Sequence, residues 1–203
     1  TSYLWFSLTK IATATAALGL VDAGRLDLAA PVTEYVDLGA RHGRHAVPEV
    51  GHLLNHTAGF GKPLPTRWVR DADTPAEDAE AFLARLLARH GRPRHAIGER
   101  AHYSNLGYLV LGEVVARAAG RPFTEHLADS VLGPTGMAHT GFPLRDQAAD
   151  LARGYNPEFE AGAVKPDRWL PVTLGARGSS AGGAASTVDD LLRFADALTA
   201  GKL

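Results

Sequence analysis

The chain has 203 residues, of which 45% are hydrophobic and 21% charged, which is near the globular average and enough for one or two small domains. Lys plus Arg number 21 against 22 for Asp plus Glu, and this balance argues against a nucleic-acid partner. No apolar run approaches the roughly 20 residues of a membrane-spanning helix. Cysteine is absent, which excludes disulfides, a thiol nucleophile and cysteine-ligated metals.

The first third of the chain predicts short helical elements. Apolar residues at helical spacing predict a helix over residues 7–23, ended by Gly24. A helical turn is expected over residues 31–36. Another short helix is expected to end with residues 52–56, before Gly59.

Helix signals continue through the rest of the chain. Thr74–Glu77 forms a capping box before a helix that ends at Gly91. Ser104 can cap the next helix and Thr187 the last one. Residues 142–185 carry few periodic signals, so we expect helix to dominate and strands to be scarce.

The segment Ser7-Leu8-Thr9-Lys10 places a hydroxyl and an amine on one face of a helix. A serine hydroxyl becomes a useful nucleophile when a nearby base takes its proton, and a lysine with a lowered pKa can be that base. The helix N-terminus adds N–H groups that favour developing negative charge. Taken alone, the same spacing also fits a helix that merely carries an exposed lysine.

Tyr103-Ser104-Asn105 lies just before a predicted helix, where a loop can direct side chains into a cleft. A phenol near a lysine can relay protons, and an asparagine amide can orient an amide substrate. The alternative is structural, with Ser104 as a helix cap and Tyr103 as a packed ring.

Five segments in order resemble the serine hydrolase family of class C β-lactamases, D-alanyl-D-alanine carboxypeptidases and related esterases. The second of these segments, Leu53–Phe60, is similar to the family's LLTHTSG stretch, from which it departs at Asn55 and Ala58. The segments are Ser7–Lys10 with Leu20–Leu28, Leu53–Phe60, Tyr103–Tyr108, Leu132–Met137 and Ala181–Phe194.

The resemblance implies an α+β, β-lactamase/transpeptidase-like fold. Within it, this chain is expected to supply mostly the helical region, with the N- and C-terminal sheet strands missing. Met137 is the only methionine, so Thr1 is not a translation start and we expect a piece of a longer protein. Residues 1–203 are accordingly predicted to be a single, incomplete domain.

The resemblance also implies roles for individual residues. Ser7 would be the acylated nucleophile, Lys10 the general base or its electrostatic partner, and Tyr103 the proton relay, with Lys10 and Tyr103 acting as one coupled unit. Asn105 would orient the substrate. The oxyanion hole would use the Ser7 N–H and a second N–H from a strand late in the family sequence.

The implied function is a serine hydrolase that forms an acyl-enzyme without metal or cofactor. Its partner would be a small-molecule or peptide-like substrate: an ester, a β-lactam or a D-Ala-D-Ala-like amide. Members of the family are often exported, so the same is implied here, whereas the oligomeric state stays open. The competing hypothesis is a non-catalytic helical binding module or an inactive fragment of such an enzyme.

Two further motif matches are set aside. Gly178–Gly182 matches a G-x-S-x-G nucleophile elbow, but no histidine follows His139 to complete a triad with Ser180. We expect a flexible glycine-rich loop there. His139-Thr140-Gly141 has the letters of the family's third motif, but it follows Leu132–Met137, where the family has no active-site strand.

Histidine and aromatic residues have structural interpretations. His52 and His56 are four apart but lack the glutamate of a metal motif, so we expect them to satisfy backbone groups. Trp5 and Phe6 are expected in the core, although either can line an acyl pocket. Solvated surface is expected for the histidines that lie among arginines, which are His42, His45, His90, His95 and His102.

Overall fold

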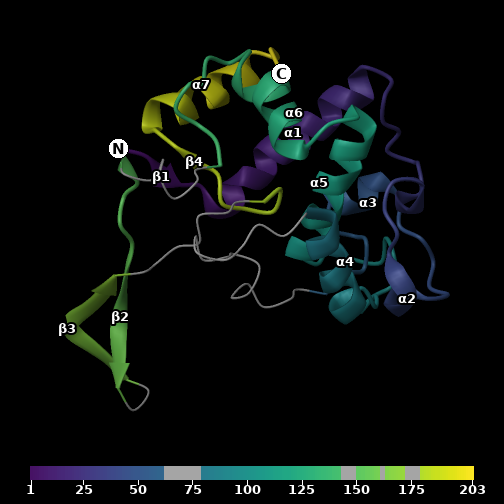
Figure 1. The fold of residues 1–203 in the computed structure, drawn as a ribbon, viewed down its shortest axis with the longest axis horizontal. Coiled ribbons are helices and arrows are strands. Elements are labelled where there is room, and N and C mark those ends of the chain that lie inside the picture. The colour runs from purple at the N-terminus through teal and green to yellow at the C-terminus, as the bar shows by residue number, and fades with distance from the viewer. Residues whose placement is uncertain (62–78, 143–149, 161–162, 172–178) are drawn as a thin grey trace.

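A computed structural model gives the fold in Figure 1 and describes residues 1–61, 79–142, 150–160, 163–171 and 179–203. Helices form one body, and a two-stranded hairpin extends away from it (Figure 1). The helices are η1 Phe6–Leu8, α1 Thr9–Asp22, η2 Val32–Glu34, α2 Gly39–His42, α3 Val50–Leu54, α4 Ala79–His90, α5 Asn105–Ala119, α6 Phe123–Leu127, η4 Ala128–Leu132 and α7 Val188–Thr199. The strands are β1 Tyr3–Leu4, β2 Tyr155–Glu160, β3 Ala163–Pro171 and β4 Ala185–Ser186.

Helix α1 lies between two hydrophobic clusters and contributes to both. Ala17 and Leu20 belong to the larger cluster, while Ala12 and Ala16 belong to the smaller one. All four are at most 2% exposed. Because most of these side chains are small, neighbouring segments can approach the α1 backbone closely on both sides.

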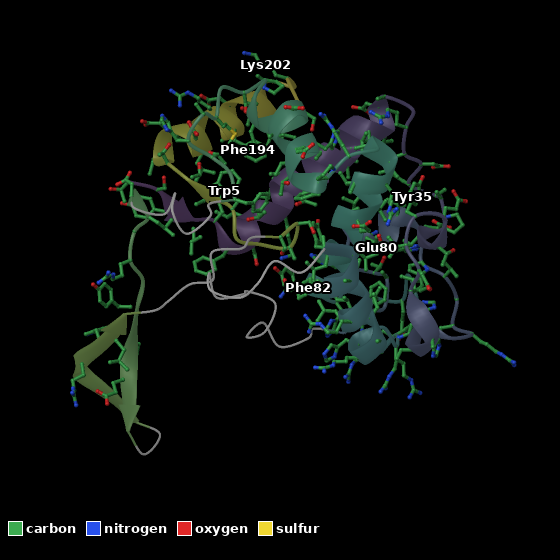
Figure 2. All side chains as sticks on the ribbon, viewed as in Figure 1. Trp5, Tyr35, Glu80, Phe82, Phe194 and Lys202 are labelled. Carbon is green, nitrogen blue, oxygen red and sulfur yellow. The ribbon has the colours of Figure 1, made fainter. Side chains whose placement is uncertain are left out.

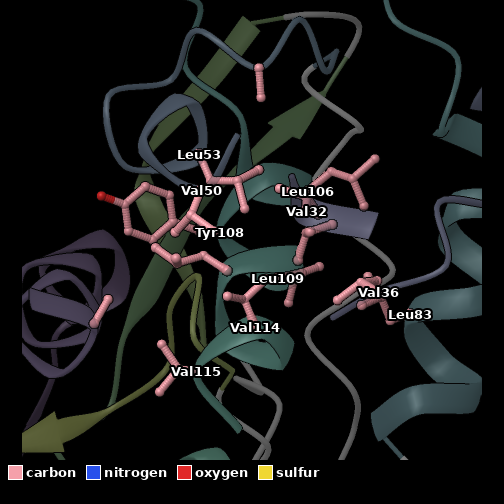
Figure 3. Packing of buried hydrophobic residues seen from close by; sticks show 14 of the residues in the cluster. Val32, Val36, Val50, Leu53, Leu83, Leu106, Tyr108, Leu109, Val114 and Val115 are labelled. Carbon is pink, nitrogen blue, oxygen red and sulfur yellow. The ribbon is translucent and has the colours of Figure 1, made fainter. Parts of the chain in front are cut away.

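The larger cluster is built around α5, which buries nearly every side (Figure 3). Leu106, Val110 and Val114 are fully buried in it. They pack with residues from η2, α3 and α4, among which Figure 3 labels Val32, Val50, Leu53 and Leu83. A helix that is apolar over most of its surface has to lie largely inside the molecule, and α5 does, with Arg117 exposed near its end.

The smaller cluster joins the two ends of the described chain. Trp5 packs against Phe194 of α7, with ring centroids 5.9 Å apart, and Figure 2 labels both. Val131 and Met137 complete the contact from the far side. Burial of such aromatic and aliphatic side chains stabilises by roughly 1.5–3 kcal/mol each, so this cluster holds α7 to the start of α1.

Short strands fix the same region through the backbone. Strands β1 and β4 are antiparallel, with Tyr3 opposite Ser186 and Leu4 opposite Ala185. Gly141 bridges to Ala185 from the other side. The segment just before Ser7 is therefore hydrogen-bonded to the segment just before α7.

The predicted helices are confirmed where the structure describes them. The helices over residues 7–23 and after Ser104 and Thr187 are present, and both caps form: Ser104 Oγ accepts from Gly107 N and Thr187 Oγ1 from Asp190 N. The capping box at Thr74–Glu77 lies outside the described residues. No helix among the described residues has both the length and the apolar content to cross a bilayer.

Helix dominates and strands are few among the described residues, as expected, but residues 142–185, which carry few periodic signals, contain the two longest described strands. Strands β2 and β3 form an antiparallel hairpin, with Tyr155 opposite Pro171 and a register shift between Pro157 and Glu158. The shift interrupts the alternation of side chains by which a strand is detected in a sequence, and prolines within both strands weaken the signal further.

Two helix glycines offer a stability test. A Cβ at Gly112 of α5 would overlap the Oγ and Cβ of Ser180, whereas a Cβ at Gly19 of α1 would meet nothing within 4 Å. We expect Gly112→Ala to lower the free energy of unfolding by about 1–3 kcal/mol through overpacking. Gly19→Ala should raise it by about 0.5–1 kcal/mol, since alanine favours helix. Urea unfolding of both variants measures this, and equal effects would contradict the packing described.

Candidate active site

The side chains of Ser7 and Lys10 meet at the start of α1. Ser7 lies in η1, the 3-10 turn that runs directly into α1, and is exposed. Lys10 lies in the first turn of α1 and is only 5% exposed. Residues three apart share a helix face, and Lys10 Nζ lies 3.5 Å from Ser7 Oγ.

The Lys10 amine also reaches two acceptors from distant parts of the chain. It donates to Asn105 Oδ1 at 2.9 Å, at the first residue of α5. It also donates to the backbone carbonyl of Ala181 in a short contact. Three segments far apart in sequence therefore converge on one nitrogen.

Tyr103 closes the arrangement from the opposite side of Ser7. Its hydroxyl donates to Ser7 Oγ at 2.6 Å, and Lys10 Nζ lies 4.8 Å from the centroid of its ring. Ser104 caps α5, and Tyr103 immediately precedes this cap. The structure thus brings together the four residues singled out from the sequence, Ser7, Lys10, Tyr103 and Asn105, whose catalytic roles remain predictions.

Burial sets the electrostatics of the lysine. Loss of hydration lowers the pKa of Lys10, and this effect exceeds the opposing hydrogen bond and charge interaction with Tyr103. A lowered pKa increases the neutral fraction of the amine at a given pH. The site therefore favours a lysine able to accept a proton.

A buried turn delivers the Ala181 carbonyl. Backbone hydrogen bonds join Ser179 and Gly182 in both directions. Ser180 Oγ donates to the Tyr108 carbonyl at 2.7 Å, and Thr13 Oγ1 donates to the Ser180 carbonyl at 2.8 Å. The expected flexible loop is thus wrong for residues 179–182, since these hydrogen bonds tie the turn to α1 and α5. Sequence patterns do not reveal this turn, because glycine and serine are equally typical of loose loops.

Neither motif that was set aside forms a second site in the described residues. Ser180 is 6% exposed and bonded to a carbonyl, so its hydroxyl is not available as a nucleophile. The backbone N–H of His139 and the hydroxyl of Thr140 donate to Asp190 Oδ2 of α7. His139-Thr140-Gly141 therefore connects α7 to β4.

The expectations for the histidines are partly confirmed and partly wrong. His52 Nδ1 accepts from the Glu49 N–H and His56 Nδ1 from the Ser104 N–H, which confirms that both satisfy backbone groups. His42 is buried against the Phe60 ring, so its placement on the surface was wrong. No cluster of three His, Cys, Asp or Glu side chains is suited to a metal ion in the described parts of the chain.

Of the two aromatic residues before Ser7, one lies as expected and the other does not. Trp5 is 6% exposed, as expected for the core, whereas Phe6 is 60% exposed. Phe6 has φ 46°, a left-handed conformation that turns the chain between β1 and α1. The alternation of β1 ends there, so the periodicity of the sequence does not show which way the ring points.

Comparison with known proteins now identifies the chain. The family model described as Beta-lactamase matches residues 1–203. The chain belongs to this family. The resemblance drawn from the sequence and the β-lactamase/transpeptidase-like fold class are both confirmed, since a penicillin-binding protein from Bacillus halodurans superposes with a TM-score of 0.80 at 28% identity. The match covers 98% of this chain and 59% of that one.

Two further similar proteins have names that state an activity. The D-alanyl-D-alanine-carboxypeptidase/endopeptidase AmpH of Escherichia coli K12 is 29% identical over 93% of this chain and 46% of its own length. D-amino acid amidase from Ochrobactrum anthropi SV3 superposes with a TM-score of 0.76 at 27% identity, over 99% of this chain and 57% of its own. The chain spans about half the length of the curated relatives it matches.

The environment of Lys10 can be tested by a charge substitution. Asn105→Asp would place a carboxylate where an amide oxygen lies 2.9 Å from Nζ, so the pKa of Lys10 should rise because the ammonium is favoured. The chain has only four lysines, so NMR titration of labelled side chains can follow Lys10.

Asn55→Asp is the matched control for this substitution. The exposed Asn55 side chain accepts from Thr57 N and should leave the Lys10 titration unchanged. Equal titration curves for wild type and Asn105→Asp would contradict the described contact.

Proposed function

We propose that this chain carries the acyl-transfer site of a serine hydrolase, with Ser7 as nucleophile. One observation carries the proposal: Ser7 Oγ lies between the Tyr103 hydroxyl at 2.6 Å and the Lys10 amine at 3.5 Å. A hydroxyl held between a proton donor and a buried amine is the arrangement that nucleophilic catalysis requires.

The hydrogen bonds of Lys10 support its role as the base. A neutral amine has two N–H donors and one lone pair. The Asn105 and Ala181 oxygens accept the two donors, which leaves the lone pair for the Ser7 hydroxyl proton. Ser7 Oγ meanwhile accepts from Tyr103, so each group has the partner that proton abstraction needs.

Acylation then follows from this pattern. Ser7 Oγ attacks the substrate carbonyl carbon as its proton passes to Lys10 Nζ, and the bond from that carbon to the leaving group breaks. The leaving group takes the Tyr103 proton, and Tyr103 recovers one from the Lys10 ammonium. Overall, one proton moves from Ser7 to the leaving group, and Ser7 is left as an ester.

Deacylation runs the same transfers with water. Water gives a proton to the Tyr103–Lys10 pair and attacks the ester carbon, and Ser7 Oγ leaves with that proton. No cofactor is needed for this cycle.

Since the pKa of Lys10 is lowered from its ordinary value, the acylation rate should rise with pH through that lowered pKa, as the amine loses its proton.

The relatives support the substrate class. AmpH is named for cleavage next to D-alanine, and the Ochrobactrum anthropi enzyme is named as a D-amino acid amidase. Both names describe acyl groups attacked at an amide. We therefore propose an ester, a β-lactam or a D-Ala-D-Ala-like amide as the substrate, with Asn105 as an orienting donor.

Covalent labelling tests the nucleophile. Incubation with a fluorophosphonate or a fluorescent penicillin should label Ser7, as located by peptide mass spectrometry, and Ser7→Ala should abolish the label. Ser130→Ala is the matched control. Ser130 of η4 donates its hydroxyl to the His126 carbonyl, so this substitution should leave labelling unchanged.

The same experiment separates the competing hypothesis. Label on a longer parent protein but not on these 203 residues would favour an inactive fragment. Label on another serine, or on neither protein, would overturn the assignment of Ser7.

A second prediction concerns the proton relay. Tyr103→Phe removes the hydroxyl that lies 2.6 Å from Ser7 Oγ, so the labelling rate of Ser7 should fall by about 100- to 10,000-fold. Tyr108→Phe is the control: its hydroxyl donates to the Leu54 carbonyl, and its loss should cost about 1 kcal/mol of stability with little change in labelling. Similar labelling rates for the two variants would exclude Tyr103 as the relay.

A further inference from the structure

His56 contacts the site without touching the nucleophile. Its ring lies between two tyrosines, with centroid distances of 4.7 Å to Tyr103 and 4.9 Å to Tyr108. Both tyrosine rings also lie near the Lys10 amine, at 4.8 and 5.5 Å from their centroids. His56 therefore separates the ring that contacts Ser7 from the ring that α5 holds in the core.

Backbone contacts join His56 to the segment that carries Tyr103. Its Nδ1 accepts from the Ser104 N–H at 3.3 Å, and its carbonyl accepts from the His102 N–H at 2.8 Å. The residues on both sides of Tyr103 are thus hydrogen-bonded to one histidine. Movement of His56 would displace Tyr103 relative to Ser7.

The backbone of His56 is itself unusual. Its φ of 63° lies in the left-handed region, which an L-residue adopts at a cost. Asparagine tolerates this conformation better than histidine. Since asparagine also offers an acceptor near the Nδ1 position, the backbone and the hydrogen bond alone do not require histidine here; the two ring contacts do.

We propose that His56 is a positioning residue, which holds Tyr103 within hydrogen-bonding distance of Ser7 by tilted ring contacts with both tyrosines and by accepting from the Ser104 N–H. The proposal rests on the proposed function of Ser7 and Tyr103. It requires neutral imidazole, because an imidazolium has no lone pair on Nδ1 for the Ser104 N–H.

The surroundings keep the imidazole neutral. Burial lowers the pKa of His56, and the positive charge of Lys10 lowers it further. Among the described residues, the titratable side chains that face it are Lys10 from α1, Tyr103 before α5 and Tyr108 within α5. None of these groups is a carboxylate, so none of them favours protonation of His56.

The first test measures labelling of Ser7 by a fluorophosphonate. His56→Ala should slow labelling about 10- to 100-fold by misplacing Tyr103, and His56→Asn, which restores the acceptor and tolerates the backbone, should recover part of the loss. His90→Ala, at the exposed end of α4, is the matched control and should label at the wild-type rate. Wild-type rates for both His56 variants would overturn the proposal.

The pH profile separates positioning from a general loss of structure. In the wild type, protonation of Lys10 stops labelling and protonation of His56 slows it further, so the acid limb should steepen from a slope of about one towards two where both groups titrate. In His56→Asn only Lys10 titrates, and the slope should stay near one. Identical acid limbs would contradict the requirement for neutral His56.

A readout independent of activity keeps the two proposals distinguishable. The chain has five tyrosines, so the labelled Cζ signal of Tyr103 can be followed by NMR. Ser7→Ala should shift this signal in the wild-type background but not in the His56→Ala background. If the signal shifts only in the wild-type background and the fluorophosphonate does not react with Ser7, the proposed hydrolase function is refuted while the positioning role of His56 stands. A shift in both backgrounds would refute the positioning role.

Discussion

The buried amine of Lys10 is the constraint on which the arrangement depends. It brings together α1, the start of α5 and the turn at residues 179–182, through Asn105 and Ala181. Burial that lowers the pKa of Lys10 also disfavours the protonated folded state relative to the unfolded chain. Between the lowered pKa of Lys10 and the ordinary lysine pKa, the unfolded state binds more protons than the folded state. Folding stability therefore decreases as the pH falls from the ordinary pKa to the lowered one. A larger neutral fraction of the Lys10 amine is thus obtained at the expense of stability.

The packing around α1 explains how such a cost is tolerated. Ala12, Ala16 and Ala17 let two clusters form on one helix, so the helix that carries Lys10 is fixed from two sides. Thr9 and Thr13 add polar contacts, to Ala184 N and the Ser180 carbonyl. The small residues on α1 therefore allow the backbone of neighbouring segments to approach the Lys10 amine. The hydroxyl-bearing residues satisfy the polar groups of that backbone, which larger apolar residues could not do.

Much of this was predictable, and the reasons for the rest are local. Helix periodicity and caps such as Ser104 located the elements, and a hydroxyl and an amine three residues apart, together with the family resemblance, pointed to Ser7 and Lys10. What the sequence does not encode locally was missed: the Ala181 acceptor is a backbone group that any residue offers, and the hairpin β2–β3 has a register shift that hides its alternation. Phe6 was misplaced because its left-handed backbone breaks the pattern from which burial is inferred.

The separation of the lysine from its carbonyl acceptor has a consequence for biosynthesis. Ala181 follows Lys10 by 171 residues, while Asn105 follows it by 95. A ribosome therefore delivers the amine first, its amide partner midway and the carbonyl last. Until that final turn emerges, the nascent lysine stays hydrated and protonated like any surface lysine. The buried environment of Lys10 would then form abruptly, when the turn at residues 179–182 docks against α1 and α5.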